Sequence, residues 1–233
     1  MRQVNISNTN AAAILYKPQQ AMRIRWNMNT DTPIPQEEPA GQNPPDGAVI
    51  NYYLAGKADG EVTLEIVDAS GKSITKFSSY DKPYEIPAVN IPLYWIRPQQ
   101  ILSGQEGSHR FLWNLHYTPI TEPATFPMTA VFQNTAPEIN SPWVLPGNYS
   151  VKLTVNGKTF TQPLTVKIDP RVKTSMTDLQ KQHSLSVTAY EGRKQAKRSM
   201  EDIAAARKQL KDRIAKGGSS VEALTKLEQQ VGE

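Results

Sequence analysis

Alternation of apolar and polar residues in short segments is the feature that most limits what this chain can fold into. Between residues 48 and 168, apolar side chains recur at every second position, the period of a β-strand with one buried face. Turn residues separate the segments, and none of them keeps the roughly 3.6-residue period of a helix. The alternating segments are 48–55, 61–68, 72–79, 108–116, 148–155 and 158–168. This stretch therefore predicts an antiparallel sheet structure.

Two turns predict how neighbouring segments pair. Asn156-Gly157 joins two alternating segments, and this dipeptide is typical of a two-residue hairpin loop because both residues accept a positive φ. The stretch from Asp68 to Gly71 predicts a second reversal of the chain, with Gly71 available for a positive φ. Pro163 predicts an edge position or a bulge in the return strand, since proline has no N–H to donate.

These segments together predict about seven short strands and an immunoglobulin-like β-sandwich over residues 48–170. The proline-containing stretch 79–107 is expected to cross between the two halves of the sandwich, and a further short strand is expected at 129–132. The chain has no cysteine, so hydrophobic packing has to hold the sheets together. The predicted core is Val62, Leu64, Ile66, Phe111, Trp113, Tyr149, Val151, Leu153 and Val166.

The segments on either side of the sandwich have different patterns. Residues 1–47 are rich in proline and weakly periodic, which predicts an extended Pro-rich lead-in with one short strand at 22–26. Residues 171–233 contain no proline and predict a C-terminal helical hairpin, with Ser175 and Asp178 resembling a capping box. The predicted fold is thus mainly β with α, in three parts.

The first of the two predicted helices is unusually long. It ends at Gly217-Gly218, and about 40 helical residues extend roughly 60 Å, which exceeds the width of a sandwich of this size. We therefore expect a hairpin that projects or that packs on another chain. Its apolar stripe consists of Leu185, Ala189, Ala196, Met200, Ile203, Leu210 and Ile214.

The charge of the chain is distributed unevenly. Residues 177–233 hold eleven basic and eight acidic side chains, and so carry most of the chain's net charge of +4. The acidic residues alternate with the basic ones at helical spacing, which predicts a solvated helix face rather than a nucleic-acid site. No apolar run approaches the roughly 18 residues of a membrane span, and the first residues do not resemble a signal peptide.

A screen for catalytic patterns finds none. The histidines His109, His116 and His183 lack metal-ligand spacing, and no nucleophile elbow, phosphate-binding loop or dinucleotide motif occurs. We therefore expect no catalytic residue, no cofactor and no metal site, and no enzyme activity of this chain by itself.

Aromatic residues in proline-flanked segments are the remaining site candidates. They could form a flat platform on which a sugar ring stacks, or they could plug the ends of the sandwich by burying their apolar area. The candidate ligand-binding residues are Tyr80, Tyr84, Tyr94, Trp95 and Trp143.

A family resemblance is carried by four stretches of the chain, 35–54, 62–72, 103–117 and 141–182. The most specific motifs in these stretches are Asn43-Pro44-Pro45-Asp46-Gly47-Ala48, Pro146-Gly147-x-Tyr149 and Asp169-Pro170-Arg171. They resemble the C-terminal region of large secreted bacterial proteins classed as glycosyl hydrolases, which are built on BNR repeats and a sortilin-like β-propeller. The resemblance implies that this chain is part of a larger protein with a propeller ahead of it, and a secreted, periplasmic or cell-surface location.

The resemblance also implies where any activity would lie. A glycosidase activity would be expected of the propeller, whose repeats do not occur in this sequence, so no catalytic residue is carried over. The expected function is a non-catalytic accessory module whose sandwich packs on the propeller and whose helices contact another protein or a second copy. The alternatives are a carbohydrate-binding module that binds a polysaccharide, or part of a glycosidase site that the propeller completes.

Overall fold

The computed structural model describes residues 11–25, 39, 41, 44–83, 99–120, 141–217 and 220–232. The chain divides into two compact units, Met1–His183 and Ser184–Glu233. The first unit contains all the described strands and the first two turns of a long helix. The second contains the rest of that helix and a shorter one.

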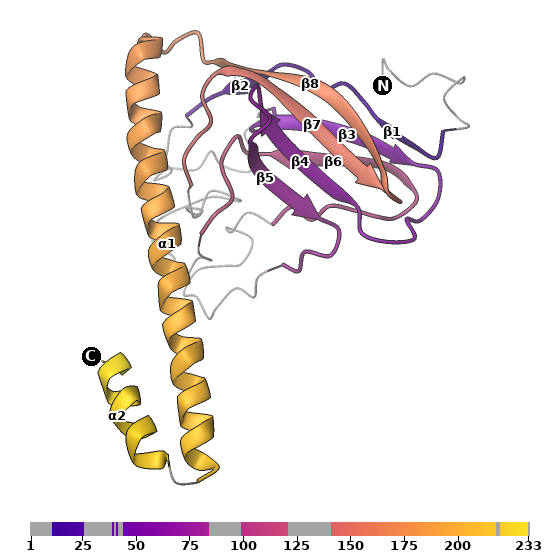
Figure 1. Ribbon diagram of the computed structural model, residues 1–233. Helices are drawn as coiled ribbons and strands as arrows, with labels where there is room; N and C mark the ends of the chain where they lie inside the picture. The colour runs from indigo at the N-terminus through magenta and orange to yellow at the C-terminus, as the bar shows by residue number, and fades with distance from the viewer. Residues whose placement is uncertain are drawn as a thin grey trace. The chain divides into compact units, whose positions relative to one another are not determined.

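Eight described strands form two sheets in the first unit (Figure 1). The smaller sheet has the order β1-β3-β6, formed by Ala13–Leu15, Ala48–Leu54 and Gly107–Trp113. The larger sheet has the order β2-β8-β7-β4-β5, formed by Ala21–Arg23, Lys158–Ile168, Gly147–Val155, Thr63–Asp68 and Ser73–Ser78. All pairs are antiparallel except β2 with β8, which is parallel.

Aromatic contacts join the inner faces of the two sheets. The ring of Phe111 on β6 lies 4.6 Å from that of Phe77 on β5, and Trp113 lies 6.1 Å from Tyr149 on β7, measured between ring centroids. All nine core residues predicted from the alternation are buried, which confirms that prediction. The first unit is therefore a β-sandwich-like structure whose core lies between the sheets.

The predicted turns are present. Asn156 and Gly157 have φ angles of 48° and 75°, and Val155 pairs with Lys158, as a two-residue hairpin requires. The Asp68 carboxylate accepts hydrogen bonds from the backbone N–H groups of Ser70 and Lys72, while Gly71 has a φ of 86°. These contacts fix the reversal between β4 and β5.

Pro163 has the local edge position that its missing N–H predicts. Although β8 lies between β2 and β7, its pairing with β2 is limited to Val166, Lys167 and Ile168. At Pro163 β8 pairs on one side only, with Ser150 of β7, within the described sheet.

The N-terminal segment differs from the prediction of a lead-in outside the sandwich. The strand predicted at 22–26 overlaps β2, but β1 pairs with β3 and β2 pairs with β8, so residues 11–25 contribute one strand to each sheet. The three residues of β1 give too few alternations for this strand to be recognised from sequence. The strand predicted at 129–132 and most of the crossing segment lie outside the described residues.

The C-terminal residues are helical, as predicted. Helix α1 (Met176–Ala215) begins after Ser175, whose hydroxyl accepts from the Asp178 N–H at 3.1 Å and donates to the Asp178 carboxylate at 2.7 Å. The helix continues without interruption through Gly192, and Gly217 follows its end with a φ of 73°. Helix α2 spans Val221–Gly232.

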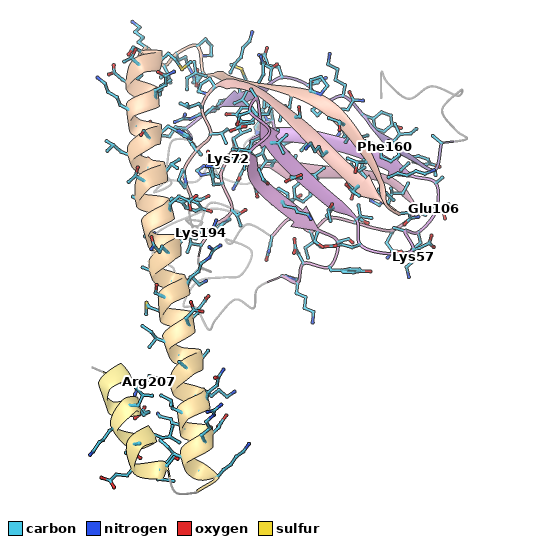
Figure 2. The ribbon with its side chains drawn as sticks, viewed as in Figure 1. Lys57, Lys72, Glu106, Phe160, Lys194 and Arg207 are labelled. Atoms are coloured by element: carbon cyan, nitrogen blue, oxygen red, sulfur yellow. The ribbon has the colours of Figure 1, made fainter. Side chains whose placement is uncertain are left out.

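Ion pairs join the two helices within the second unit. Arg207 and Lys211 of α1 approach Glu228 of α2 at 2.9 and 3.7 Å, and Figure 2 shows Arg207 beside the shorter helix. The first two turns of α1 belong instead to the strand unit, where Leu179 is buried and the ring of His183 lies 5.9 Å from that of Tyr117.

Two glycines provide a matched test of the sandwich. Gly47 and Gly71 have φ angles of 85° and 86°, but a Cβ at Gly47 would lie 2.0 Å from the Trp113 carbonyl oxygen, whereas nothing lies within 4 Å of a Cβ at Gly71. We expect Gly71→Ala to cost about 1 kcal/mol of unfolding free energy, from backbone strain alone. Gly47→Ala should cost about 2 kcal/mol more, because the β3–β6 pair has to shift. Urea unfolding measures both, and equal losses would contradict the close approach.

Candidate site around Arg23

The sequence candidates fall in different places. Tyr80 is 67% exposed, and Trp143 is half-buried. No ring contact links these two within the described part of the chain. Tyr84, Tyr94 and Trp95 lie outside the described residues, so the stacking platform stays a prediction.

Trp143 is engaged by its neighbours. Its ring meets that of His116 edge to face at a centroid distance of 5.2 Å, and the two residues form an isolated antiparallel bridge. The guanidinium carbon of Arg23 lies 4.6 Å from the centre of the Trp143 ring, within the range of a cation–π interaction. One face of the indole is therefore occupied by a cation, which leaves at most the other face for a ligand.

Arg23 is the centre of this cluster. It is the last residue of β2, it occupies a buried position of that strand, and it is only 7% exposed. Its Nη1 donates a hydrogen bond to the Val144 carbonyl at 3.1 Å, while its Nε is buried without a partner. Burial lowers the pKa of Arg23, because desolvation penalises the charged form.

Two histidines stand near this charge. His116 Nδ1 donates to the Ser141 carbonyl at 2.6 Å, since a carbonyl oxygen can only accept. Burial lowers the pKa of His116 to about 4, and the positive charge of Arg23 contributes to that shift. Burial also lowers the pKa of His183, again with a contribution from Arg23. Both imidazoles are therefore neutral near pH 7.

A strained turn brings His116 and Tyr117 to the cluster. Leu115 has a φ of 64°, which is unusual for a bulky side chain, and its side chain is buried. Backbone hydrogen bonds hold it there, because Leu115 accepts from Val144 N–H at 2.9 Å and Tyr117 N–H donates to Pro142 at 3.0 Å. Such strain persists only where the surrounding contacts determine the backbone.

Tyr149 completes the cluster from β7. Its hydroxyl donates to the Leu145 carbonyl at 2.7 Å, and burial raises the pKa of Tyr149 to about 12. We call the set Arg23, His116, Trp143, Tyr149 and His183 the Arg23 cluster. It offers a fixed positive charge beside aromatic surface, an arrangement suited to binding an anionic group.

Sequence reasoning found only part of this site. Trp143 was a candidate for its aromatic ring, and Tyr149 was expected in the core. Arg23 lay in the short strand expected at 22–26 of the lead-in, but it was not a site candidate. The available signal was a charged residue in a buried position of the alternating stretch Ala21-Met22-Arg23.

Comparison with known proteins adds no relative, since no protein-family model, curated protein or solved structure matches the chain. Among the described residues, neither helix combines the length and apolarity needed to cross a bilayer, and no group of three or more His, Asp or Glu could hold a metal ion. The class that the structure defines is a β-sandwich-like protein with a helical C-terminal segment.

The low pKa of His116 predicts acid sensitivity. Its folded-state pKa of about 4 lies below the ordinary histidine value of 6.5, so the unfolded chain takes up a proton that the folded chain does not. The stability from neutral His116 is fully present above about pH 6.5 and falls as the pH drops toward 4, by up to about 3 kcal/mol. Urea unfolding near pH 7 and pH 4.5 should therefore show a smaller loss for His116→Gln than for the unsubstituted chain. An identical loss would contradict the assignment.

Proposed function

We propose that this chain is a non-catalytic accessory and interaction module of a larger secreted protein, in which the sandwich is the scaffold and the helices contact a protein partner. The exposed apolar residues of α1 carry the proposal. Leu185, Met200 and Ile203 are 73%, 70% and 48% exposed. Large apolar side chains concentrated on one helix favour a partner, whereas scattered ones would need no explanation.

These three residues share one side of the helix. At about 100° per residue, Leu185, Met200 and Ile203 project within about 60° of one another. At the C-terminal end of the same stripe, Leu210 and Ile214 are half-buried, near the ion pairs that join α1 to α2. The chain itself therefore covers only the C-terminal end of the stripe, and we propose that the partner covers the exposed part.

The charges beside the stripe favour an acidic partner. The same periodicity places Arg193, Lys197, Lys208 and Lys211 along one flank of the stripe. Lys197 and Lys211 also pair within the chain, with Glu201 and Glu228 at 3.8 and 3.7 Å. Antiparallel pairing with a second copy would bring this basic flank against itself. We therefore propose a partner surface with apolar residues flanked by acidic ones, and a second copy becomes an outcome of the test.

We further propose that the sandwich is immunoglobulin-like. If β3 and β6 are strands B and E, and β4, β5, β7 and β8 are strands C, C′, F and G, the sheet orders match those of an immunoglobulin-type sandwich, with the first strand split between both sheets. The hydroxyl of Tyr149 on β7 donates to the carbonyl of Leu145, four residues upstream and just before the strand. This contact supports the proposal, because it resembles the tyrosine corner of strand F.

A carbohydrate-binding module is the second candidate, and the exposure of Tyr80 is the observation that favours it. The contact between Arg23 and Trp143 weighs against it, because a sugar needs an open aromatic face. Binding of glycans that is lost on Tyr80→Ala, with α1 substitutions having no effect, would favour this candidate over the helix interface.

Photo-crosslinking from α1 tests the proposed function. A photoreactive amino acid at Met200 lies in the stripe, and one at the exposed Ala205 lies on the opposite side of the same helix. In cells that make the full-length parent, we expect position 200 to crosslink to a polypeptide segment with apolar and acidic residues, and position 205 to give no such product. No product, or equal products from both positions, would overturn the proposal.

A matched pair of substitutions tests the same surface in solution. Ala196 and Ala205 are both exposed on α1, on opposite sides. Ala196→Glu places a carboxylate in the stripe and should weaken partner binding roughly tenfold or more, whereas Ala205→Glu should leave it unchanged. A solution mass of two chains that only Ala196→Glu reduces would identify a second copy and contradict the acidic partner.

A further inference from the structure

The guanidinium of Arg23 has one edge without a partner. Nη1 is bonded to the Val144 carbonyl, but Nε is buried and unpaired. Nη2 also has no hydrogen bond among the described residues. The Nε and Nη2 donors point in the same direction and form the fork that accepts two oxygens of an anion.

Two other arginines show how this chain uses that edge. Arg171 donates from Nε to both oxygens of Asp169, at 2.9 and 3.0 Å, and its Nη2 also bonds to this carboxylate. Arg207 donates from Nε and Nη2 to Glu228, at 3.1 and 2.9 Å. In both cases the Nε–Nη2 edge holds a carboxylate. At Arg23, no described residue accepts a hydrogen bond from this edge.

Asp169 lies next to the residue that pairs with Arg23 in the sheet, but its carboxylate is already bound by another arginine. Asp169 follows Ile168, the residue that pairs with Arg23, and its backbone N–H donates to the Arg23 carbonyl at 3.3 Å. Its side chain, however, is held by Arg171. No ion pair to Arg23 is found in the described part of the chain.

An unpaired buried cation is costly, and so it calls for an explanation. A charged group removed from water without a counter-ion destabilises a fold, and most buried donors have a partner. The stacking on Trp143 offsets part of this cost but fills none of the donor positions. The geometry is that of a binding site whose ligand supplies the missing acceptors.

The charge of the cluster selects a monoanion. His116 and His183 are neutral near pH 7, because burial and the nearby Arg23 lower both pKa values. Lys72, whose charge also lowers the pKa of His183, is exposed, and solvent screens it. Among the described residues, Arg23 is the one buried cation, so a dianionic phosphate would leave one negative charge uncompensated.

We propose that Arg23 binds a carboxylate, with both oxygens on the Nε–Nη2 edge and the Trp143 ring fixing the plane of the guanidinium. When the carboxylate binds, both Nε and Nη2 gain an acceptor. It belongs either to a small organic acid or to an acidic residue of a bound polypeptide. This site lies in the strand unit and does not depend on the proposed role of the helices.

Arginine side-chain NMR on the intact chain tests the site directly. The Nε–H signal of Arg23 is identified by its loss in Arg23→Lys, which keeps the charge but lacks the two-donor edge. Before any acid is added, Arg171 and Arg207 should give signals typical of carboxylate-bound Nε–H, and Arg23 should not. On titration with acetate at constant ionic strength, we expect the Arg23 signal alone to move, saturably, toward the position of the other two.

The arms of the titration separate the outcomes. A blocked peptide with one glutamate that binds roughly tenfold more tightly than acetate assigns the ligand to a polypeptide, and equal binding assigns it to a small acid. Inorganic phosphate that displaces acetate, or an Arg23 signal that does not respond, overturns the proposal. So does a signal already at the bound position, because a carboxylate of this chain would then fill the edge.

A second variant keeps the test valid if Arg23→Lys does not fold. Trp143→Phe retains an aromatic ring under Arg23 but weakens the cation–π contact. It should keep the saturable acetate response while weakening it by a few fold. An unchanged response would show that Trp143 does not position the guanidinium, and that part of the proposal would fail.

Discussion

The packing of Trp113 between the two sheets is the contact on which the rest of the structure depends. With no disulfide available, the sheets are held by apolar burial, and Trp113 is the largest fully buried side chain among the residues that the structure describes. Removing a buried tryptophan costs about 3 to 5 kcal/mol, a large part of the stability of a domain this size. Its indole Nε1 also donates to the His116 carbonyl at 2.9 Å, so the core residue holds the backbone of the Arg23 cluster. The approach of Gly47 to the Trp113 carbonyl adds a third constraint at the same point.

Strong local patterns made much of the fold predictable from sequence. Strands β3 to β8 contain enough alternations for one face to be recognised, and Asn156-Gly157 and Ser175 are signals that act through their own neighbours. Strand β1 and the pairing of β1 and β2 with the two sheets were missed, because this pairing depends on partners distant in the sequence. Local sequence carries little information about such pairing.

The candidate site was less predictable for the same reason. Arg23, His116, Trp143 and His183 come from four separate parts of the chain, and only the fold brings them together. Aromatic composition drew attention to Trp143, but not to the cation on its face. The strain at Leu115 is likewise invisible in sequence, since leucine gives no sign of a positive φ. Tyr84, Tyr94 and Trp95 remain predictions, because they lie outside the described residues.

The two proposed surfaces share a preference for acidic partners but differ in its physical basis. On α1 the basic flank lies in solvent, where each pair contributes little and salt weakens the attraction. Its role is therefore to select a partner, while apolar contact supplies most of the affinity. At Arg23 the charge is buried, so screening is weak and the geometry of two donors decides which anion fits. Salt should consequently affect the helix surface far more than the Arg23 site, which allows the two to be separated in the same chain.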